Sequence, residues 1–303
     1  MVDPTKLRIL QAIEQHGSLA AVARIMYLTP SAVSQQIRQL ADEVNADLLE
    51  REGRSVRLTP AAHRLLEFSY LASEAWEDTR SDLEALSVGD RLSGHLSVSS
   101  FATAIPALVA PAASSLCMQT PEVTITVQEM GTTDSLDHLT QQTVDLAILA
   151  APTNPPLEDP RFEQANLVDD PQDLVVAQSS NIATRGVNRL RDVSDENWIE
   201  PHIDQRRLIE SACEMEGFAP RFTHQANDWS AVLALVAAGM GLCLYPRMAP
   251  LDRSGVIRVP LTGSNLPIRR VLTCIRAGSS QRPVIVAFLQ SLNRSVPDQA
   301  EDR

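Results

Sequence analysis

The chain has 303 residues, of which 44% are hydrophobic, and a formal net charge of −12. This length predicts about two or three domains with complete hydrophobic cores. The sequence contains no apolar run of roughly eighteen residues that could span a membrane, and its first residues lack the basic and apolar regions of a signal peptide. We therefore expect a cytoplasmic protein without a membrane partner.

The acidic charge is unevenly distributed along the chain. Residues 1–65 contain eight Lys and Arg against seven Asp and Glu, a balance of +1, so the acidic excess lies downstream. A DNA-binding module in this nearly neutral part would have weak non-specific affinity and would depend on base contacts and on dimerisation. The charge therefore excludes a general nucleic-acid-coating protein but not a sequence-specific one.

Residues 19–40 have the pattern of two short helices joined by a tight turn. The first helix carries an apolar stripe from Ala20 to Met26, and Thr29 and Pro30 provide a cap and a first residue for the second helix. The apolar residues of the second helix that would face inward are Val33, Ile37 and Leu40. The polar residues of its outer face are Ser31, Ser34, Gln35 and Arg38.

A helix–turn–helix places its second helix in the major groove of DNA, with its N-terminal residues against the base edges. The pattern therefore predicts that Thr29, Pro30 and the polar outer face contact DNA. A buried helical hairpin would show the same apolar spacing, so the flanking residues have to separate the two interpretations. Residues 47–59 read as two short strands around Gly53, and arginines on such a wing can contact phosphates or enter a minor groove. The wing arginines are Arg51, Arg54 and Arg57, of which we expect Arg51 and Arg54 to contact DNA.

Residues 7–66 resemble the winged helix–turn–helix of the LysR-type transcriptional regulators. The matching positions are Gly17-Ser18, Ala20-Ala21, Ser31-Ala32-Val33-Ser34, Gln36-Ile37, Leu40, Leu48, Arg51 and Leu58-Thr59-Pro60-Ala61. Pro30 stands where glutamine is common in the family, Gln35 where arginine is common, and Ala41 where glutamate is usual. Because an arginine at position 35 would contact phosphate or guanine, the base preference of relatives cannot be transferred to this chain. Asn45 replaces the usual glycine after the second helix and tolerates the left-handed conformation expected there.

The segment from Pro60 to Leu86 has no internal Gly or Pro, and its apolar residues recur at three- and four-residue spacing. This pattern predicts one long helix with an apolar seam that comprises Leu65, Phe68, Ala72, Trp76 and Leu83. A lone helix between two domains would leave that seam in water, so we expect it to pair with a second copy of the chain. Packing of the helix against its own domain is the alternative. The resemblance to LysR-type regulators implies that this helix is the dimerisation element.

Residues 94–150 alternate between strand and helix patterns. Strands are expected at 95–99, 123–128 and 146–150, with helices near 104–118 and 133–142. This order predicts a parallel sheet with helices on both faces.

Two segments rich in Pro and Gly follow, at 152–160 and 260–267. The second α/β unit between them would have strands near 173–177, 222–226 and 242–245, and helices near 205–217 and 229–238. After it, 270–276 reads as a strand and 284–292 as a helix that return to the first unit. Two crossovers between two lobes predict a hinged architecture, and the weaker resemblance to LysR-type regulators in this half implies an effector-binding domain.

The predicted fold class is a multi-domain α+β protein with an N-terminal winged helix–turn–helix, a long linker helix and a C-terminal two-lobed α/β effector domain like a periplasmic binding protein. The expected boundaries are 1–62 for the DNA-binding domain, 63–90 for the linker, 91–295 for the effector-binding domain and 296–303 for a disordered tail. Within the effector-binding domain, lobe I would comprise 91–160 and 269–295, and lobe II 161–268.

Hydroxyl groups follow the first two expected strands of lobe I. In open α/β sheets, ligands bind at the carboxyl ends of strands, near helix N-termini that favour anions. These hydroxyl groups could hold a small carboxylate, as the LysR resemblance also implies for the first of the two loops, although plain helix capping needs no ligand. The candidate effector-binding residues are Ser99, Ser100, Thr103 and Thr132, with His202 and Asn227 from the other lobe.

The other chemistry-bearing residues form no catalytic or metal-binding pattern. The segment Gly239-Met240-Gly241 ends a helix and enters a strand, the reverse of a dinucleotide-binding loop, so capping and close packing explain it. The six histidines form no ligand cluster, and the sequence has no nucleophile elbow or phosphate loop. We expect no enzyme activity, no metal and no cofactor. An α/β enzyme that carries a DNA-binding appendage is one alternative.

The four cysteines lie far apart in apolar stretches at Cys117, Cys213, Cys243 and Cys274. Buried free thiols are the expected state, and a redox-responsive regulator that uses Cys213 or Cys243 is the second alternative. The main interpretation is a ligand-responsive, sequence-specific transcriptional regulator of LysR type. Its expected partners are an imperfect inverted repeat of double-stranded DNA, a small metabolite and further copies of the chain in a homodimer or homotetramer, with RNA polymerase as a further candidate.

Overall fold

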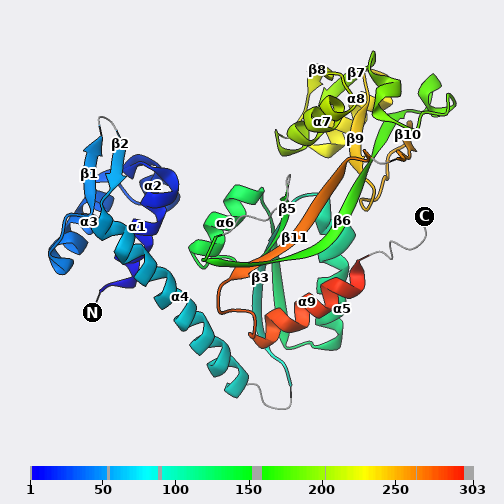
Figure 1. Cartoon of the computed structure of the whole chain (residues 1–303). Coiled ribbons are helices and arrows are strands. Elements are labelled where there is room, and N and C mark those ends of the chain that lie inside the picture. The colour runs from blue at the N-terminus through cyan, green and yellow to red at the C-terminus, as the bar shows by residue number, and fades with distance from the viewer. Residues whose placement is uncertain are drawn as a thin grey trace.

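The computed structural model describes residues 2–52, 55–87, 91–151, 159–201, 203–263 and 265–296. A winged helix at the N-terminus is followed by one long helix and then by a two-lobed α/β domain (Figure 1). This is the three-part architecture that the sequence predicts. None of the helices in the described ranges is long and apolar enough to cross a membrane.

Three helices and a two-stranded wing form the first unit. Their bounds are α1 (Pro4–His16), α2 (Leu19–Ile25), α3 (Pro30–Val44), β1 (Leu49–Glu52) and β2 (Ser55–Leu58). Their apolar faces meet in one core, to which α3 contributes Val33, Ile37 and Leu40, the three residues predicted to face inward. The wing strands pair antiparallel on either side of residues 53–54, as expected.

Both ends of α3 have the local structure that the sequence predicts. The Thr29 hydroxyl accepts a hydrogen bond from the Ala32 amide at 3.2 Å, and Pro30 is the first residue of the helix. Asn45 ends the helix in the left-handed conformation, with a φ of 50°. Asparagine visits this region more readily than other residues with a side chain because its short amide bonds locally.

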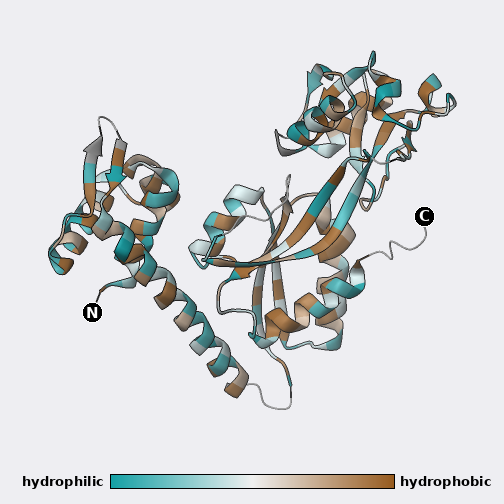
Figure 2. Cartoon of the chain, viewed as in Figure 1, coloured by the Kyte–Doolittle hydropathy of each residue, from teal (hydrophilic) through white to brown (hydrophobic). Residues whose placement is uncertain are grey.

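The linker is a single helix of 28 residues, α4 (Pro60–Ser87). One side of it is buried in its own chain, with Ser69 against α1 and with Glu77 and Ser81 against the two-lobed domain. The other side presents large apolar residues that are each more than half exposed, namely Phe68, Leu71, Trp76, Leu83 and Leu86. Figure 2 shows hydrophobic residues recurring along the whole helix. Thus α4 packs against its own domain and also keeps an apolar seam exposed.

Lobe I is built on a mixed sheet with helices on both faces. Its strands are β3 (Gly94–Ser100), β4 (Val123–Glu129), β5 (Leu146–Ala151), β11 (Ile268–Arg276) and the first part of β6 (Phe162–Ala177). The strands β4, β3 and β5 are parallel as predicted, and β11 runs antiparallel to β5 and β6. The helices are η1 (Ile105–Val109), α5 (Ala110–Gln119) and α9 (Pro283–Ser295) on one face and α6 (Thr132–Thr140) on the other.

Lobe II surrounds the second part of β6. Its strands are β7 (Asn197–Glu200), β8 (Arg221–Gln225), β9 (Cys243–Pro246) and β10 (Val256–Val259). Its helices are α7 (Ile203–Met215), α8 (Trp229–Ala237) and the short turns η2 (Asn181–Ala183) and η3 (Leu190–Val193). The strands β9 and β10 pair antiparallel with β6, and β7 and β8 form a separate parallel pair.

The two lobes share β6, a continuous strand of 16 residues, whereas the sequence predicts a strand only at 173–177. The first part of β6 lacks a strand pattern because Asp169, Asp170 and Pro171 interrupt it. Pairing with β11 nevertheless holds this part extended, from Phe162 opposite Arg276 to Pro171 opposite Ile268. The sheet of lobe I therefore continues past the lobe boundary that we expected at residue 160.

Gly239 and Gly241 have the roles of capping and close packing that the sequence predicts. Gly239 follows α8 with a φ of 73°, and its amide bonds the Val236 carbonyl at 2.9 Å. A Cβ at Gly241 would stand 2.9 Å from the Asn197 carbonyl oxygen. Neither glycine serves a phosphate-binding loop.

We expect Gly241→Ala to lower the free energy of unfolding by about 1–3 kcal/mol, because the added methyl group overlaps the Asn197 carbonyl. Urea unfolding followed by circular dichroism measures the loss. Gly131→Ala is the matched control, since a Cβ there meets nothing within 4 Å and its φ of −73° suits alanine. Equal losses in the two variants would contradict the steric explanation.

Candidate functional site

The outer face of α3 carries the polar residues that the sequence places there. The exposed ones are Thr29, Pro30, Ser31, Gln35 and Arg38, and Ser34 is half-buried. The hydroxyl oxygens of Thr29 and Ser31 lie 3.0 Å apart, and Arg38 Nε donates to the Ser34 carbonyl at 3.3 Å. Because the opposite face of α3 is buried in the core, these side chains are among those that the helix presents to solvent, together with Gln39, Asp42 and Glu43.

The sequence interpretation misses Tyr27, which lies beside this face. It stands in the turn between α2 and α3 with a φ of 54°, and the residue is 90% exposed. A large side chain in the left-handed region costs conformational energy, and here no burial offsets that cost. Tyr27 is therefore a further candidate contact residue. No sequence signal distinguishes it from an ordinary turn residue.

For one further predicted residue the structure describes the backbone alone, and two others lie outside it. Arg51 lies in β1 opposite Val56, and its side chain is not among the described ones. Arg54 and His202 lie outside the described residues.

A cleft of about 270 Å³ lies between the two lobes. Among the predicted effector-binding residues, Thr103, Thr132 and Asn227 line it. Ser99 and Ser100 do not, because β3 lies between β4 and β5 and its last residues are fully buried. Other residues that line the cleft are Phe101, Met130, Gln205, Leu208, Trp229 and Arg269.

Arg269 is a candidate functional residue of this cleft that sequence reasoning misses. It is 8% exposed, and its Nη2 lies 2.7 Å from Asp170 Oδ2 and 3.1 Å from Thr103 Oγ1. Its guanidinium carbon lies 4.4 Å from the centre of the Phe101 ring. Burial lowers the pKa of Arg269, and the ion pair with Asp170 opposes that shift. In the described part of the chain, Arg269 Nε has no hydrogen-bond partner.

The charged residues at the mouth of the cleft are acidic, whereas the buried one at its floor is Arg269. Glu129 and Asp134 are exposed there on the side of lobe I, while lobe II contributes Asn227 and Trp229. The helix α6 begins at Thr132 without a hydrogen bond from a capping side chain, so its first amides remain available. The cleft therefore combines a buried cation, free helix amides, hydroxyl groups and apolar walls.

Three of the four cysteines have thiols that burial makes less reactive. Cys213, Cys243 and Cys274 are buried and free, and burial raises the pKa of each to about 12. The thiolate is the reactive form, so these three groups react slowly at neutral pH. Cys117 is free and half-buried. Among the residues described, no group of three or more His, Cys, Asp or Glu could hold a metal ion.

Comparison with protein families identifies both parts of the chain. Residues 89–297 match the model described as "LysR substrate binding domain", and residues 4–63 match that of "Bacterial regulatory helix-turn-helix protein, lysR family". The chain belongs to the LysR family of transcriptional regulators. As a LysR-type regulator, it is a DNA-binding protein with an effector-binding domain.

Relatives and solved structures align with most of this LysR-type chain. The HTH-type transcriptional regulator AlsR of Bacillus subtilis (strain 168) is 26% identical over 80% of this chain and 81% of its own length. The fold matches that of a full-length OxyR variant from Pseudomonas aeruginosa, with a TM-score of 0.64, 19% identity and coverage of 96% and 95% of the two chains. It also matches full-length CbnR complexed with its target DNA, with a TM-score of 0.58, 22% identity and coverage of 97% and 99%.

We expect a thiol reagent such as Ellman's reagent to label the native protein at Cys117 and to leave Cys213, Cys243 and Cys274 unlabelled until the protein unfolds. The raised pKa values and the burial of these three thiols give the reason. Mass spectrometry of labelled peptides, with and without urea, measures the reactivity of each cysteine. Rapid native labelling of Cys213 or Cys243 would contradict this assignment.

Proposed function

We propose that this LysR-type regulator reads an imperfect inverted repeat of double-stranded DNA as a homodimer or homotetramer and responds to a small carboxylate in the cleft between its lobes. The observation that carries the proposal is the polar outer face of α3, which begins at the capping residue Thr29, on a chain that also holds a cleft with a buried arginine. The protein would act in the cytoplasm, with RNA polymerase as a further candidate partner.

In the proposed complex, α3 enters the major groove. Ser34 and Gln35 would read base edges, and Gln35 can bond adenine through both its amide atoms. Arg38, with Arg51 and Arg54 from the wing, would contact phosphates and set the register without carrying sequence information. Two such helices, related by a dimer axis, would occupy successive major grooves.

The exposed seam of α4 supports pairing with a second copy. Phe68, Ala72, Trp76 and Leu83 are exposed along one side of the helix, and Leu65 is half-buried at its start. Apolar residues at this spacing, left in water over a long helix, favour association with a matching helix. The partner helix would double the number of DNA contacts, which a nearly neutral DNA-binding domain requires.

The cleft supports an effector with a carboxylate group. Arg269 is held at its floor by Asp170, Thr103 offers a hydroxyl, and the start of α6 offers backbone amides. Glu129 and Asp134 at the mouth would repel a second anionic group and favour a hydrogen-bond donor there. Under this proposal the chain is not an enzyme.

A redox-responsive regulator is the second candidate function. The fold shared with OxyR keeps this candidate open, while the raised pKa values of Cys213 and Cys243 count against it. An unchanged affinity for DNA after peroxide treatment would remove it.

We expect Gln35→Ala to relax base preference at one position in each half-site, with a loss of about 1–3 kcal/mol of discrimination for a bidentate contact. Sequencing of DNA selected from a random library by each protein measures the change. In the matched variant Arg54→Ala, affinity should fall for all sequences and the salt dependence should weaken by about one unit of slope. Identical selected sequences for wild type and Gln35→Ala would exclude this residue from base readout.

We expect small carboxylates to raise the melting temperature of the full-length protein, and Thr132→Val to reduce that rise. Thermal shift with the monocarboxylates benzoate, lactate and pyruvate as probes measures the effect, because a ligand that binds only the folded state stabilises it. Thr140→Val is the control, since Thr140 lies at the far end of the same helix, where its hydroxyl bonds the Leu136 carbonyl. No stabilisation by any probe would contradict a carboxylate effector.

A further inference from the structure

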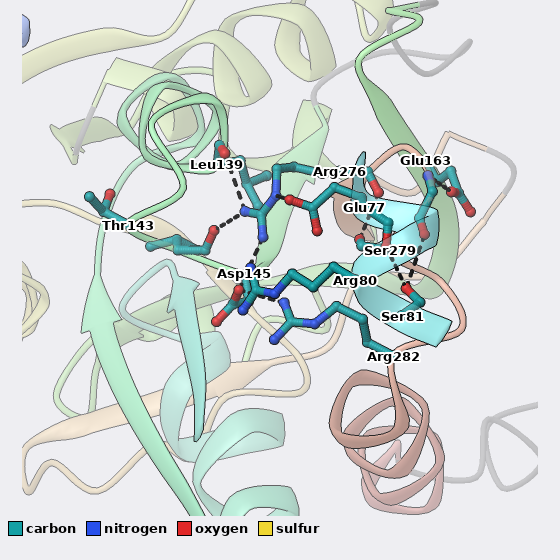
Figure 3. Close-up of polar contacts among 12 residues, drawn as sticks. Glu77, Arg80, Ser81, Leu139, Thr143, Asp145, Glu163, Arg276, Ser279 and Arg282 are labelled. Carbon is teal, nitrogen blue, oxygen red and sulfur yellow. Dashed lines mark hydrogen bonds and ion pairs between the residues drawn. The ribbon is translucent and has the colours of Figure 1, made fainter. Parts of the chain in front are cut away.

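A cluster of buried charges joins α4 to the base of lobe I, at the opposite end from the effector cleft. Figure 3 shows Arg276 and Arg282 beside Glu77 and Arg80, with Asp145 close to both arginines. Arg276 is 7% exposed, and its Nε and Nη2 lie 2.8 Å from Glu77 Oε1 and 3.0 Å from Asp145 Oδ1. The Arg276 side chain therefore links the linker helix to the first residue before β5.

Arg282 provides a second link between the same two parts. It is 2% exposed, and its Nη1 lies 2.7 Å from Asp145 Oδ1 while its Nε lies 2.9 Å from Glu84 Oε2. Burial opposes ionisation of Asp145, but the hydrogen bond from Arg282 and the neighbouring positive charges lower its pKa below the usual value. Asp145 is therefore charged at neutral pH, and it connects the two arginines.

The backbone of the turn after β11 also lies close to α4. The Ser81 hydroxyl of α4 donates to the Gly278 carbonyl at 3.2 Å, and the Gly278 amide donates to Glu163 at 2.8 Å. A Cβ at Gly278 would stand 2.5 Å from the Glu74 carbonyl of α4. The turn after β11 and the linker helix are thus in direct contact, without room for a side chain.

The elements that form this contact also reach the effector cleft. On β11, Arg269 lies in the cleft and Arg276 at the linker, about 23 Å apart for an extended strand. On α6, Thr132 lies in the cleft, and the Leu139 carbonyl near the other end accepts from Arg276 at 3.3 Å. Two rigid elements therefore run from one site to the other.

Two buried polar atoms near the contact between α4 and lobe I have no hydrogen-bond partner within the described residues. Glu77 is 1% exposed, yet its Oε2 has no hydrogen-bond partner in the described part of the chain, and the same holds for Arg8 Nε on α1. Both residues line a cavity of about 40 Å³ where α1, α4 and lobe I meet. Burying unpaired polar atoms costs free energy, so separation of α4 from lobe I would relieve a cost as well as break bonds.

The charged residues between α4 and lobe I favour an interface that can separate reversibly in water. A buried ion-pair network stabilises a fold no better than well-packed apolar residues would. When the two sides separate, however, each charged group is hydrated, whereas two exposed apolar faces would be unfavourable in water. The composition of this interface therefore favours reversible separation over permanent packing.

We propose that Arg276, Arg282 and Asp145 of lobe I form a releasable latch on Glu77 and Glu84 of the linker helix, and that its opening frees the DNA-binding domain to turn relative to lobe I. In the closed state the winged helix also contacts lobe I directly, since His16 Nε2 lies 3.3 Å from Asp137 Oδ1 on α6. The proposal relies on the proposed function only for the signal that opens the latch. Its test needs neither effector nor DNA.

Hydrogen–deuterium exchange of the full-length protein tests the latch. Glu77→Gln removes the charge that pairs with Arg276, and we expect exchange to become about tenfold faster in residues 74–86 and 276–282. Exchange in α3 and in the strands of lobe II should stay as in wild type. The control Glu67→Gln makes the same change on the same helix, at an exposed pair with Arg64, and should leave exchange unchanged.

Glu84→Gln is the second variant, because Glu84 is half-buried at the edge of the latch and its loss is less disruptive for folding. We expect the same two segments to exchange faster and the maximum dimension from small-angle X-ray scattering to grow. Unchanged exchange at both segments in Glu84→Gln would overturn the proposal. Acceleration spread evenly over the core of lobe I would also overturn it, because that result indicates a purely structural role. Failure of the Gln35 or Thr132 predictions would leave this outcome unaffected.

Discussion

The antiparallel pairing of β6 with β11 is the interaction on which the arrangement of the sensor half depends. The ladder extends from Ile268 opposite Pro171 to Arg276 opposite Phe162, with a register shift at Val271 and Leu272. Because β6 continues beyond this ladder to pair with β9 and β10, one strand belongs to both lobes. The same ladder places a buried arginine at each end of β11, one in the cleft and one against the linker helix. A change in strand register would displace both.

The linker helix α4 has one side buried in its own chain and another side that exposes apolar residues. Its polar residues Glu77 and Ser81 are buried against the effector domain, while Phe68 and Trp76 remain exposed on the other side. A helix that used all its faces in its own chain could not pair with a second copy, and one that used none would transmit no change from lobe I. The division of α4 between charged and apolar faces fits both the proposed pairing and the proposed latch. It also explains why its overall pattern in sequence looks less sharply amphipathic than that of α3.

Local signals made the DNA-binding half predictable from sequence. The cap at Thr29, the proline after it and the left-handed Asn45 each depend on residues within a few positions along the chain. The structure confirms all three predictions. The sensor half was predictable only in outline, because its decisive contacts are distant in sequence. Glu77 and Arg276, for example, are 199 residues apart. No periodicity marks such a pair, and an isolated arginine in a strand looks like a surface residue until the fold buries it.

The close approach at Gly278 has a consequence for how a single chain can respond. The Glu74 carbonyl lies where any side chain at Gly278 would have to stand, so α4 has no room to slide gradually along lobe I. Close-packed contacts of this kind have discrete arrangements and do not deform continuously. Each chain should therefore be either seated or unseated. A graded output across a cell would then arise from the fraction of seated chains, not from intermediate positions of the helix.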